Sequence, residues 1–303
     1  MAITAAMVKE LRELTGAGMM DCKKALGETD GNMDEAVEYL RKNGQAKAEK
    51  KAGRIAAEGL CTVVVKDDKT AAVVEVNSET DFVAKNDTFR EFVEAVATQA
   101  VNSDAADMDA FMEEKWNADE SKTVKDALVE KVAVIGENLK IRRFEKVVAE
   151  NGCVVSYIHG GGRIGVIVDA DTTVVNDAVK EALTNIAMQI AALNPKYVSR
   201  DEKEILLAQI MNDPKESQKP EKVIHGMIEG RISKELKEIC LVDQVYVKAE
   251  DGKQTVGKYL EQVSKEVGAP VSVKKFVRFE TGEGLEKKNE DFAAEVAAQI
   301  AGN

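Results

Sequence analysis

Histidine and cysteine, the side chains that most metal sites and many catalytic sites use, are scarce in this sequence. Its 303 residues include two histidines, His159 and His225, and neither has a pair of potential metal ligands near it. The four cysteines, none of which belongs to a Cys-x-x-Cys pair, are Cys22, Cys61, Cys153 and Cys240. This scatter is typical of reduced thiols in a cytosolic protein. We therefore expect no zinc site, no histidine-based triad and no cofactor.

Long apolar runs and nucleotide-binding motifs are also absent. No apolar run approaches the roughly 18 residues of a membrane span, and the segment MAITAAMVKELREL lacks the apolar centre of a signal peptide. The sequence has no G-x-x-x-x-G-K-[ST] motif, so we expect no nucleotide in a P-loop. The net charge of -12 opposes general binding to nucleic acid, because phosphate contacts dominate that affinity. We expect a cytoplasmic protein that binds no nucleotide, nucleic acid or membrane directly.

The sequence does contain enough apolar residues, 44%, for a sizeable core, and its length predicts about two domains of mixed α+β class. Residues 1–44 favour three short helices, with Thr4 and Asn32 as N-caps and Glu35 completing a capping box. We expect Gly44 to end the third helix and residues 45–59 to form a solvated, partly helical linker. The first module then covers residues 1–54.

Two following segments resemble each other. The first has a strand hairpin over 60–77 and a helix over 87–101, and the second has strands over 139–149, 153–159 and 163–169 and a helix over 175–193. With an offset of 90, residues 73–102 match residues 163–192 at seven of thirty positions. We predict two related subdomains packed into one core, an N-subdomain over 55–140 and a C-subdomain over 141–198 and 241–280.

Residues 199–240 show a different pattern. Ser199 and Glu202 form a capping box, Pro214 and Pro220 break the chain, and apolar residues then recur at steps of three and four. This pattern predicts an antiparallel coiled-coil hairpin inserted into the core. The remaining elements that we expect are strands over 244–248 and 271–280 and, within a C-terminal module over 281–303, a helix over 291–300.

The run His159-Gly160-Gly161-Gly162 has two interpretations. A similar run forms the oxyanion hole of α/β-hydrolases, but those enzymes also need a G-x-S-x-G nucleophile elbow, which this sequence lacks. A tight glycine turn between two strands is the favoured interpretation. A hydrolase that uses His159 stays open as an alternative function, as does a ubiquitin-type adaptor, which the three-helix bundle suggests.

The segment that stands out is Thr80-Asp81-Phe82-Val83, between a strand and a helix. A loop that carries an aromatic side chain beside a charge often binds a partner. Phe82 could instead pack into the core, but under the 90-residue offset its counterpart is Thr172, so the same scaffold does without an aromatic side chain there. Asp81, which matches Asp171, could be a turn or cap residue.

Six stretches, in order along the whole chain, resemble the elongation factor Ts family. Residues 3–26 resemble its N-terminal signature and residues 75–86, EVNSETDFVAKN, its second signature. The other matching stretches are residues 136–143, 157–168, 229–245 and 278–296. The resemblance implies a non-enzymatic guanine-nucleotide exchange factor of protein biosynthesis. Such a factor binds GDP-bound and nucleotide-free elongation factor Tu and promotes release of GDP so that GTP can rebind.

The resemblance also implies which segments contact the partner. The loop of Thr80, Asp81, Phe82 and Val83 is expected to intrude near the partner's Mg²⁺ site. The N-terminal module is implied to be a UBA-like bundle that touches the G domain, with Met19, Met20 and Lys23 as candidate contacts. The C-terminal half of the core is implied to touch another partner domain, with His159, Gly160, Gly161 and Gly162 as candidates. Whether the coiled-coil hairpin also forms a homodimer is left open by the sequence.

Overall fold

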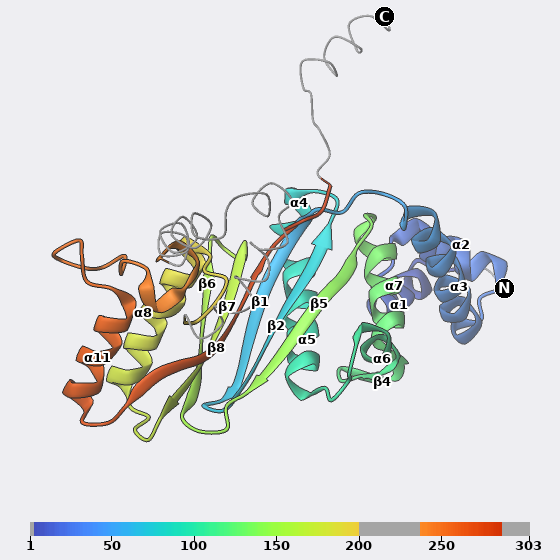
Figure 1. Ribbon diagram of the computed structural model, residues 1–303. Coiled ribbons are helices and arrows are strands. Elements are labelled where there is room, and N and C mark those ends of the chain that lie inside the picture. The colour runs from blue at the N-terminus through green and yellow to red at the C-terminus, as the bar shows by residue number, and fades with distance from the viewer. Residues whose placement is uncertain (1–2, 200–236, 287–303) are drawn as a thin grey trace, which may run out of the picture. The chain divides into compact units, whose positions relative to one another are not determined.

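The computed structural model describes residues 3–199 and 237–286. It is of α+β class, with helices at the N-terminus followed by sheets and further helices (Figure 1). The expected coiled-coil hairpin at 199–240 lies almost wholly outside the described residues, and so does the closing helix at 291–300. Within the described residues no helix could cross a membrane. All four cysteines are buried and free of disulfides, as their spacing predicted.

The chain forms two compact units. The first comprises residues Met1–Cys61, Val74–Phe144 and Glu280–Asn303, and the second comprises residues Thr62–Val73 and Glu145–Phe279. The boundaries between the units fall close to residues 61, 73, 144 and 279, which belong to strands described below.

The first unit opens with the three expected helices, α1 (Ala5–Thr15), α2 (Met19–Glu28) and α3 (Met33–Lys51). Thr4 and Asn32 cap α1 and α3 through their side chains, as predicted, and Gly16 ends α1 in the left-handed conformation with φ of 66°. The helices share a small core of buried side chains, namely Val8, Leu11, Cys22, Ala25, Leu26 and Ala36. The existence and order of the three expected helices are therefore confirmed.

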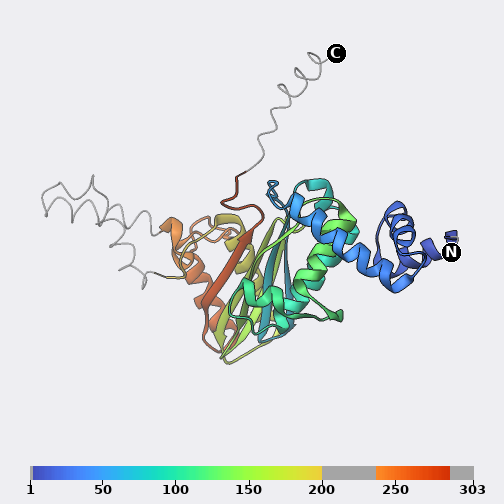
Figure 2. The same cartoon turned by 90° about the vertical axis from the view of Figure 1, so that its right-hand side faces the viewer.

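The expected end of the third helix at Gly44 is wrong. Helix α3 continues to Lys51, so that about half of the expected linker is helical, and Figure 2 shows it as one unbroken helix. Gly44 is buried against α7 (Val124–Ile135), where an added Cβ would lie 3.5 Å from the Cβ of Ala133. The glycine thus permits close packing of two helices and does not end one.

A three-stranded sheet has the order β1 (Glu58–Asp67), β2 (Thr70–Ser78), β5 (Lys140–Val148). Helix α5 (Asp87–Asn102) follows β2, as expected, and buries Phe89 and Phe92. The sequence analysis expected no strand between residues 104 and 138. The chain instead forms α6 (Met108–Glu113), a small antiparallel pair of β3 (Lys115–Trp116) and β4 (Asp119–Thr123), and α7.

A second three-stranded sheet has the order β6 (Cys153–His159), β7 (Ile164–Thr172), β8 (Val271–Glu280). Strands β6 and β7 are antiparallel, in register from Cys153 opposite Ala170 to His159 opposite Ile164. Helices α8 (Asp177–Leu193) and α11 (Val256–Val267) contribute to one core with residues of this sheet. The expected strand at 244–248 is wrong, because only Val245 makes an isolated bridge there, and η2 (Leu241–Asp243) precedes it. Helix α11 was missed.

Each of the two sheets has a glycine that lies against the backbone of the neighbouring strand. A Cβ added to Gly59 would lie 2.1 Å from the carbonyl oxygen of Val76, and one added to Gly152 would lie 2.1 Å from that of Ala170. Both glycines have positive φ, 128° and 92°, so a larger residue is excluded at each position by space and by backbone conformation. Strand β2 therefore corresponds to β7 with an offset of 94, the separation of Val76 from Ala170, and Gly59 corresponds to Gly152 with an offset of 93.

The helices that follow correspond with a different offset. Asn86 caps α5 and Asn176 caps α8, each through its side chain, which gives an offset of 90. The first half therefore has four residues more between strand and helix, and α4 (Asp81–Ala84) is four residues long. The expected equivalence of Phe82 with Thr172 is accordingly wrong, because Thr172 is the last residue of β7 and Phe82 lies in the extra segment.

Buried glutamines provide a further correspondence. Gln99 of α5 donates from Nε2 to the carbonyl oxygen of Lys115 (3.1 Å) and accepts at Oε1 from the N–H of Asn117 (2.9 Å). Gln189 of α8 makes the same pair of bonds with the backbone of Val245 and of the residue two positions later (3.0 and 2.7 Å). In both halves a helix thus holds the next extended segment through one amide side chain.

Candidate partner-binding loop

The segment Thr80–Val83 forms a short helical turn with a fixed beginning. Thr80 is the N-cap of α4, and its Oγ1 accepts a hydrogen bond from the N–H of Val83 (3.4 Å). Ala84 is buried beneath the turn, and Asn86 then caps α5 by accepting from the N–H of Phe89 (3.3 Å). Because a capped turn leads directly into a capped helix, the loop presents a defined surface.

Phe82 lies on the outside of this turn. Its side chain is 79% exposed, so the alternative that it packs into the core is wrong. The ammonium group of Lys85 lies 5.9 Å from the centroid of its ring. An aromatic side chain held in water by a rigid turn is unfavourable in the free protein and well suited to burial against a partner.

Asp81 is the first residue of α4 and not its cap. Its carboxylate pairs with the ammonium group of Lys85 at 2.6 Å, and both groups are exposed. The hydrogen bond from Lys85 holds the pKa of the Asp81 carboxyl below its usual value. Asp81 therefore remains charged at neutral pH beside Phe82, with Val83 half-buried behind them.

Glu137, which the sequence analysis did not select, holds the start of the loop. Its Oε2 accepts hydrogen bonds from the N–H groups of Glu79 and Thr80, both at 3.1 Å. Its Oε1 accepts from the hydroxyl of Thr80 at 2.7 Å. The only signal in the sequence was its place in the stretch 136–143, which gave no reason to connect it with a residue 57 positions earlier.

The N-terminal candidates lie in the first half of α2. Met19 and Met20 are 60% and 74% exposed, and Lys23 is exposed one turn later. Leu14, in the last turn of α1, is also exposed and was missed. Such apolar side chains on one small bundle are typical of a surface that another protein covers.

The glycine candidates form the turn between β6 and β7, as the favoured interpretation predicted. Gly160, Gly161 and Gly162 all have positive φ, at 60°, 66° and 105°. The N–H groups of Gly162 and Arg163 donate to the carbonyl oxygen of His159 (3.3 and 3.0 Å), so they are directed into the turn and not toward an oxyanion. His159 is exposed, and its Nδ1 lies 3.0 Å from the hydroxyl of Tyr157.

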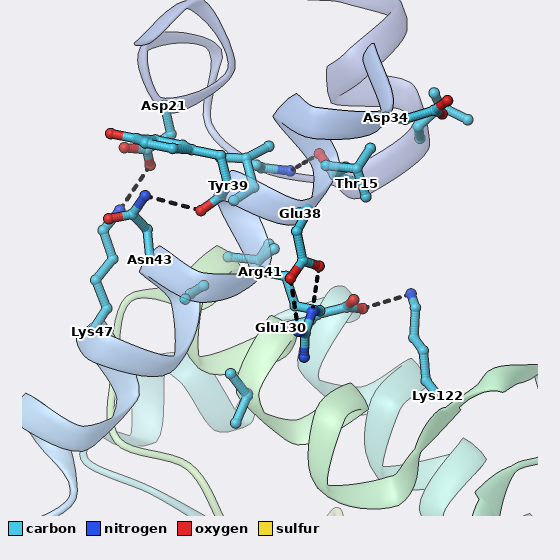
Figure 3. Close-up of a pocket in the computed structure, with 18 of the residues that line it drawn as sticks. Thr15, Asp21, Asp34, Glu38, Tyr39, Arg41, Asn43, Lys47, Lys122 and Glu130 are labelled. Atoms are coloured by element: carbon cyan, nitrogen blue, oxygen red, sulfur yellow. Dashed lines mark hydrogen bonds and ion pairs between the residues drawn. The ribbon is translucent and has the colours of Figure 1, made fainter. Parts of the chain in front are cut away.

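A pocket of about 620 Å³ lies in the first unit, where α1–α3 meet β4 and α7 (Figure 3). Among the charged side chains that line it, Lys47 pairs with Asp21 at 3.0 Å and Lys122 with Glu130 at 2.8 Å. Over the described ranges, 3–199 and 237–286, no group of three or more His, Cys, Asp or Glu side chains could hold a metal ion. The pocket thus lies between packed helices, and several of the charged side chains that line it already pair with one another.

Comparison with known proteins gives a consistent result. The family model described as elongation factor TS matches residues 79–283. Elongation factor Ts of Clostridium novyi (strain NT) is 53% identical over 308 residues, which cover 98% of this chain and 99% of that protein. Elongation factor Ts of Clostridium tetani (strain Massachusetts / E88) is 51% identical with the same coverage. That of Clostridium kluyveri (strain NBRC 12016) is 50% identical and covers 99% of both chains.

Proposed function

This chain belongs to the elongation factor Ts family, and we propose that it uses the Thr80–Val83 loop to disturb the Mg²⁺ and phosphate site of elongation factor Tu. As a member, it is a nucleotide-exchange factor for elongation factor Tu, and it is not an enzyme. A translation elongation factor works in the cytoplasm, in agreement with the location expected from the sequence. The observation that carries the mechanism is the exposure of Phe82 on a capped four-residue turn that the second half of the core lacks.

The energetic basis of exchange is thermodynamic coupling. A protein that binds the nucleotide-free form of the GTPase more tightly must weaken nucleotide affinity by the same factor by which nucleotide weakens its own binding. Phe82 supplies part of this difference if its ring is buried only after the Mg²⁺ ligands have shifted. Burial of one such ring is worth about 1.5–3 kcal/mol, or about ten- to a hundredfold in equilibrium. The remaining coupling has to come from other contacts.

Two further surfaces are proposed to supply those contacts. Met19, Met20 and Lys23 would contact the G domain, and their support is the exposure of both methionines on α2. The turn His159–Gly162 would contact another domain of the partner. Its support is that His159 is exposed at the end of a hairpin whose turn contains three glycines with positive φ.

The finer architecture is also a proposal. We propose a UBA-like module over 1–54, related subdomains over 55–140 and over 141–198 with 241–280, a coiled-coil hairpin over 199–240 and a C-terminal module over 281–303. The relation of the subdomains is supported by the matching glycines, asparagine caps and buried glutamines of the two halves. The hairpin and a homodimer through it concern residues outside the described part of the chain.

The direct test is the release of labelled GDP from elongation factor Tu. Elongation factor Tu loaded with a fluorescent GDP analogue is mixed with excess unlabelled GDP, with and without this protein, at several Mg²⁺ concentrations. We expect release to accelerate with protein concentration, and excess Mg²⁺ to reduce the acceleration. Release at the spontaneous rate at every concentration would contradict the function. Acceleration that is unaffected by Mg²⁺ would contradict the proposed mechanism.

A further inference from the structure

We propose that Glu137 is a positioning residue, which holds the Thr80–Val83 loop in the one conformation that projects Phe82 into solvent. Its effect on nucleotide exchange rests on the function proposed above, but its effect on the conformation of the loop does not. The proposal concerns residues of the first unit only.

The carboxylate of Glu137 is directed at the backbone immediately before α4. Its two oxygens accept three hydrogen bonds, two from the successive N–H groups of Glu79 and Thr80 and one from the Thr80 hydroxyl. Hydrogen bonds that a charged group accepts are stronger than neutral ones. One carboxylate therefore fixes both the backbone and the side chain of the residue that begins the turn.

The Thr80 hydroxyl passes this constraint on to the rest of the loop. A hydroxyl has a single proton, and the 2.7 Å bond to Glu137 uses it. The lone pairs of the same oxygen then face the N–H of Val83, which donates to it at 3.4 Å. The bond that caps α4 is thus oriented by Glu137, although Glu137 contacts neither Phe82 nor Val83 through a hydrogen bond of its own.

The arrangement is reciprocal. While Glu137 accepts from the backbone of Glu79, the Oε1 of Glu79 accepts from the N–H of Asn138 at 2.6 Å. Arg54 joins the same pair of segments, because its guanidinium lies 3.3 Å from Glu79 and its carbonyl oxygen accepts from the Asn138 side chain at 2.8 Å. The segment before α4 and the segment after α7 therefore hold each other, because a glutamate of each accepts a hydrogen bond from a backbone N–H of the other.

The other half of the core provides an internal comparison. Helices α7 and α11 are both 12 residues long, and each ends at a glycine in the left-handed conformation, Gly136 and Gly268. The next residue is Glu137 in the first half and a buried alanine, Ala269, in the second. The half with α4 has the glutamate, and the half without α4 lacks it. The connection from helix to strand therefore forms without a glutamate. This comparison points to the Thr80–Val83 loop as the segment that needs Glu137.

The conformational part of the proposal is tested in the free protein. Amide hydrogen exchange over residues 79–83 is measured by NMR for the wild type and for Glu137→Gln, which keeps the size of the side chain but turns an NH₂ group toward backbone donors. We expect exchange at Glu79, Thr80 and Val83 to accelerate by about tenfold or more, as for the loss of a hydrogen bond to a charged group. Unchanged protection at these three amides would overturn the proposal.

A matched control separates this effect from a general loss of stability. Glu114 also uses both carboxylate oxygens, accepting from Ser103 at 2.7 Å and from Gln99 at 3.0 Å, but it does not contact the loop. Glu114→Gln should leave amide exchange over residues 79–83 unchanged. If Glu114→Gln accelerates it as much as Glu137→Gln does, the effect is global and the proposal fails.

The functional part is tested by a double-mutant cycle with Phe82→Ala. At saturating concentrations of the factor, Glu137→Gln should slow the catalysed GDP release by about fivefold or more, the equivalent of one lost hydrogen bond. In the Phe82→Ala background it should have little further effect, because the ring that it positions is absent. Equal effects in both backgrounds would overturn the positioning role. If Phe82→Ala itself has no effect on release, the proposed function fails, and the amide measurement still decides the role of Glu137.

Thr80 offers an independent check. Thr80→Ser keeps the hydroxyl that connects Glu137 to Val83, so the Val83 amide should stay about as protected from hydrogen exchange as in the wild type. Thr80→Val keeps the shape and removes the hydroxyl, and should reproduce the effect of Glu137→Gln. Equal hydrogen-exchange rates at the Val83 amide in the serine and valine variants would contradict the transmission through this hydroxyl.

Discussion

Gly44 of α3 faces Ala133 of α7 so closely that the space between the two helices has room for one methyl group. A Cβ on Gly44 would lie 3.5 Å from the Cβ of Ala133 and 3.8 Å from Cγ1 of Val129, both ordinary contact distances. Gly44 is helical and its φ is not positive, so alanine meets no backbone strain there. A longer side chain would have to push α3 away from α7.

This contact predicts opposite effects for two substitutions. Gly44→Ala should raise the free energy of unfolding by up to about 1 kcal/mol, because glycine is a poor helix former. Gly44→Leu should lower it by about 1–3 kcal/mol, the usual cost of overfilling a packed contact. Urea denaturation followed by circular dichroism measures both. If leucine is tolerated as well as alanine, α3 and α7 do not pack closely in solution.

Replacement of Phe82 with alanine should separate activity from stability. Because the ring is 79% exposed, the free energy of unfolding should change by less than about 0.5 kcal/mol. Catalysed GDP release should fall by about tenfold or more, if the ring is buried in the complex. Thermal melting and exchange are measured on the same sample.

The matched control for Phe82 is Phe89, which is fully buried in α5. Phe89→Ala should cost about 3–5 kcal/mol of stability, as expected for a core phenylalanine. A loss of stability in Phe82→Ala that approaches this value, with normal release per folded molecule, would show that Phe82 packs inside the protein.

The two exposed methionines of α2 give a third prediction. The double variant Met19→Ser, Met20→Ser should bind nucleotide-free elongation factor Tu about tenfold more weakly or worse, because apolar area that the complex buries is lost. Its melting temperature should not change. Met33→Ser is the control, because Met33 packs against the small core of the bundle and should lower the melting temperature. Wild-type affinity of the double variant in a titration would remove α2 from the interface.

Glu75 predicts how stability depends on pH. Burial is the largest influence on its pKa and raises it, but bonds from Gly282, Asn77, Arg143 and Arg142 outweigh burial and leave the pKa below its usual value of 4.5. A carboxyl whose pKa is depressed by folding stabilises the fold above its unfolded pKa, and this contribution is lost as pH falls through the folded pKa. Stability should therefore decrease as the pH is lowered below 4.5.

The variant Glu75→Gln identifies the part of this pH dependence that comes from Glu75. It should cost about 3–5 kcal/mol at neutral pH, because two arginines lose a buried partner. It should also flatten the decrease of stability in acid. Unfolding free energies at pH 7 and at several lower values provide the measurement. An acid dependence as steep in the variant as in the wild type would assign it to other carboxyl groups.

The sequence alone determined the elements whose signals are local. The helices α1, α2, α5 and α8 have apolar residues on one face, and side chains of the adjacent residues cap three of them, so their existence and most of their boundaries follow from short segments. The glycine run at 160–162 predicted its turn for the same reason. The ordered motifs predicted the family, because their order and spacing over the whole chain are highly specific.

The tertiary structure decided the features that depend on residues far apart in the chain. Gly44 lies inside α3, where it packs against α7, some ninety residues later in the sequence. Phe82 is exposed because the loop is held by Glu137, 57 positions after Thr80. A local pattern contains no information about such partners, since the same glycine or phenylalanine is compatible with several environments. The residues that the folded chain places beside a glycine or phenylalanine decide which of these environments it has.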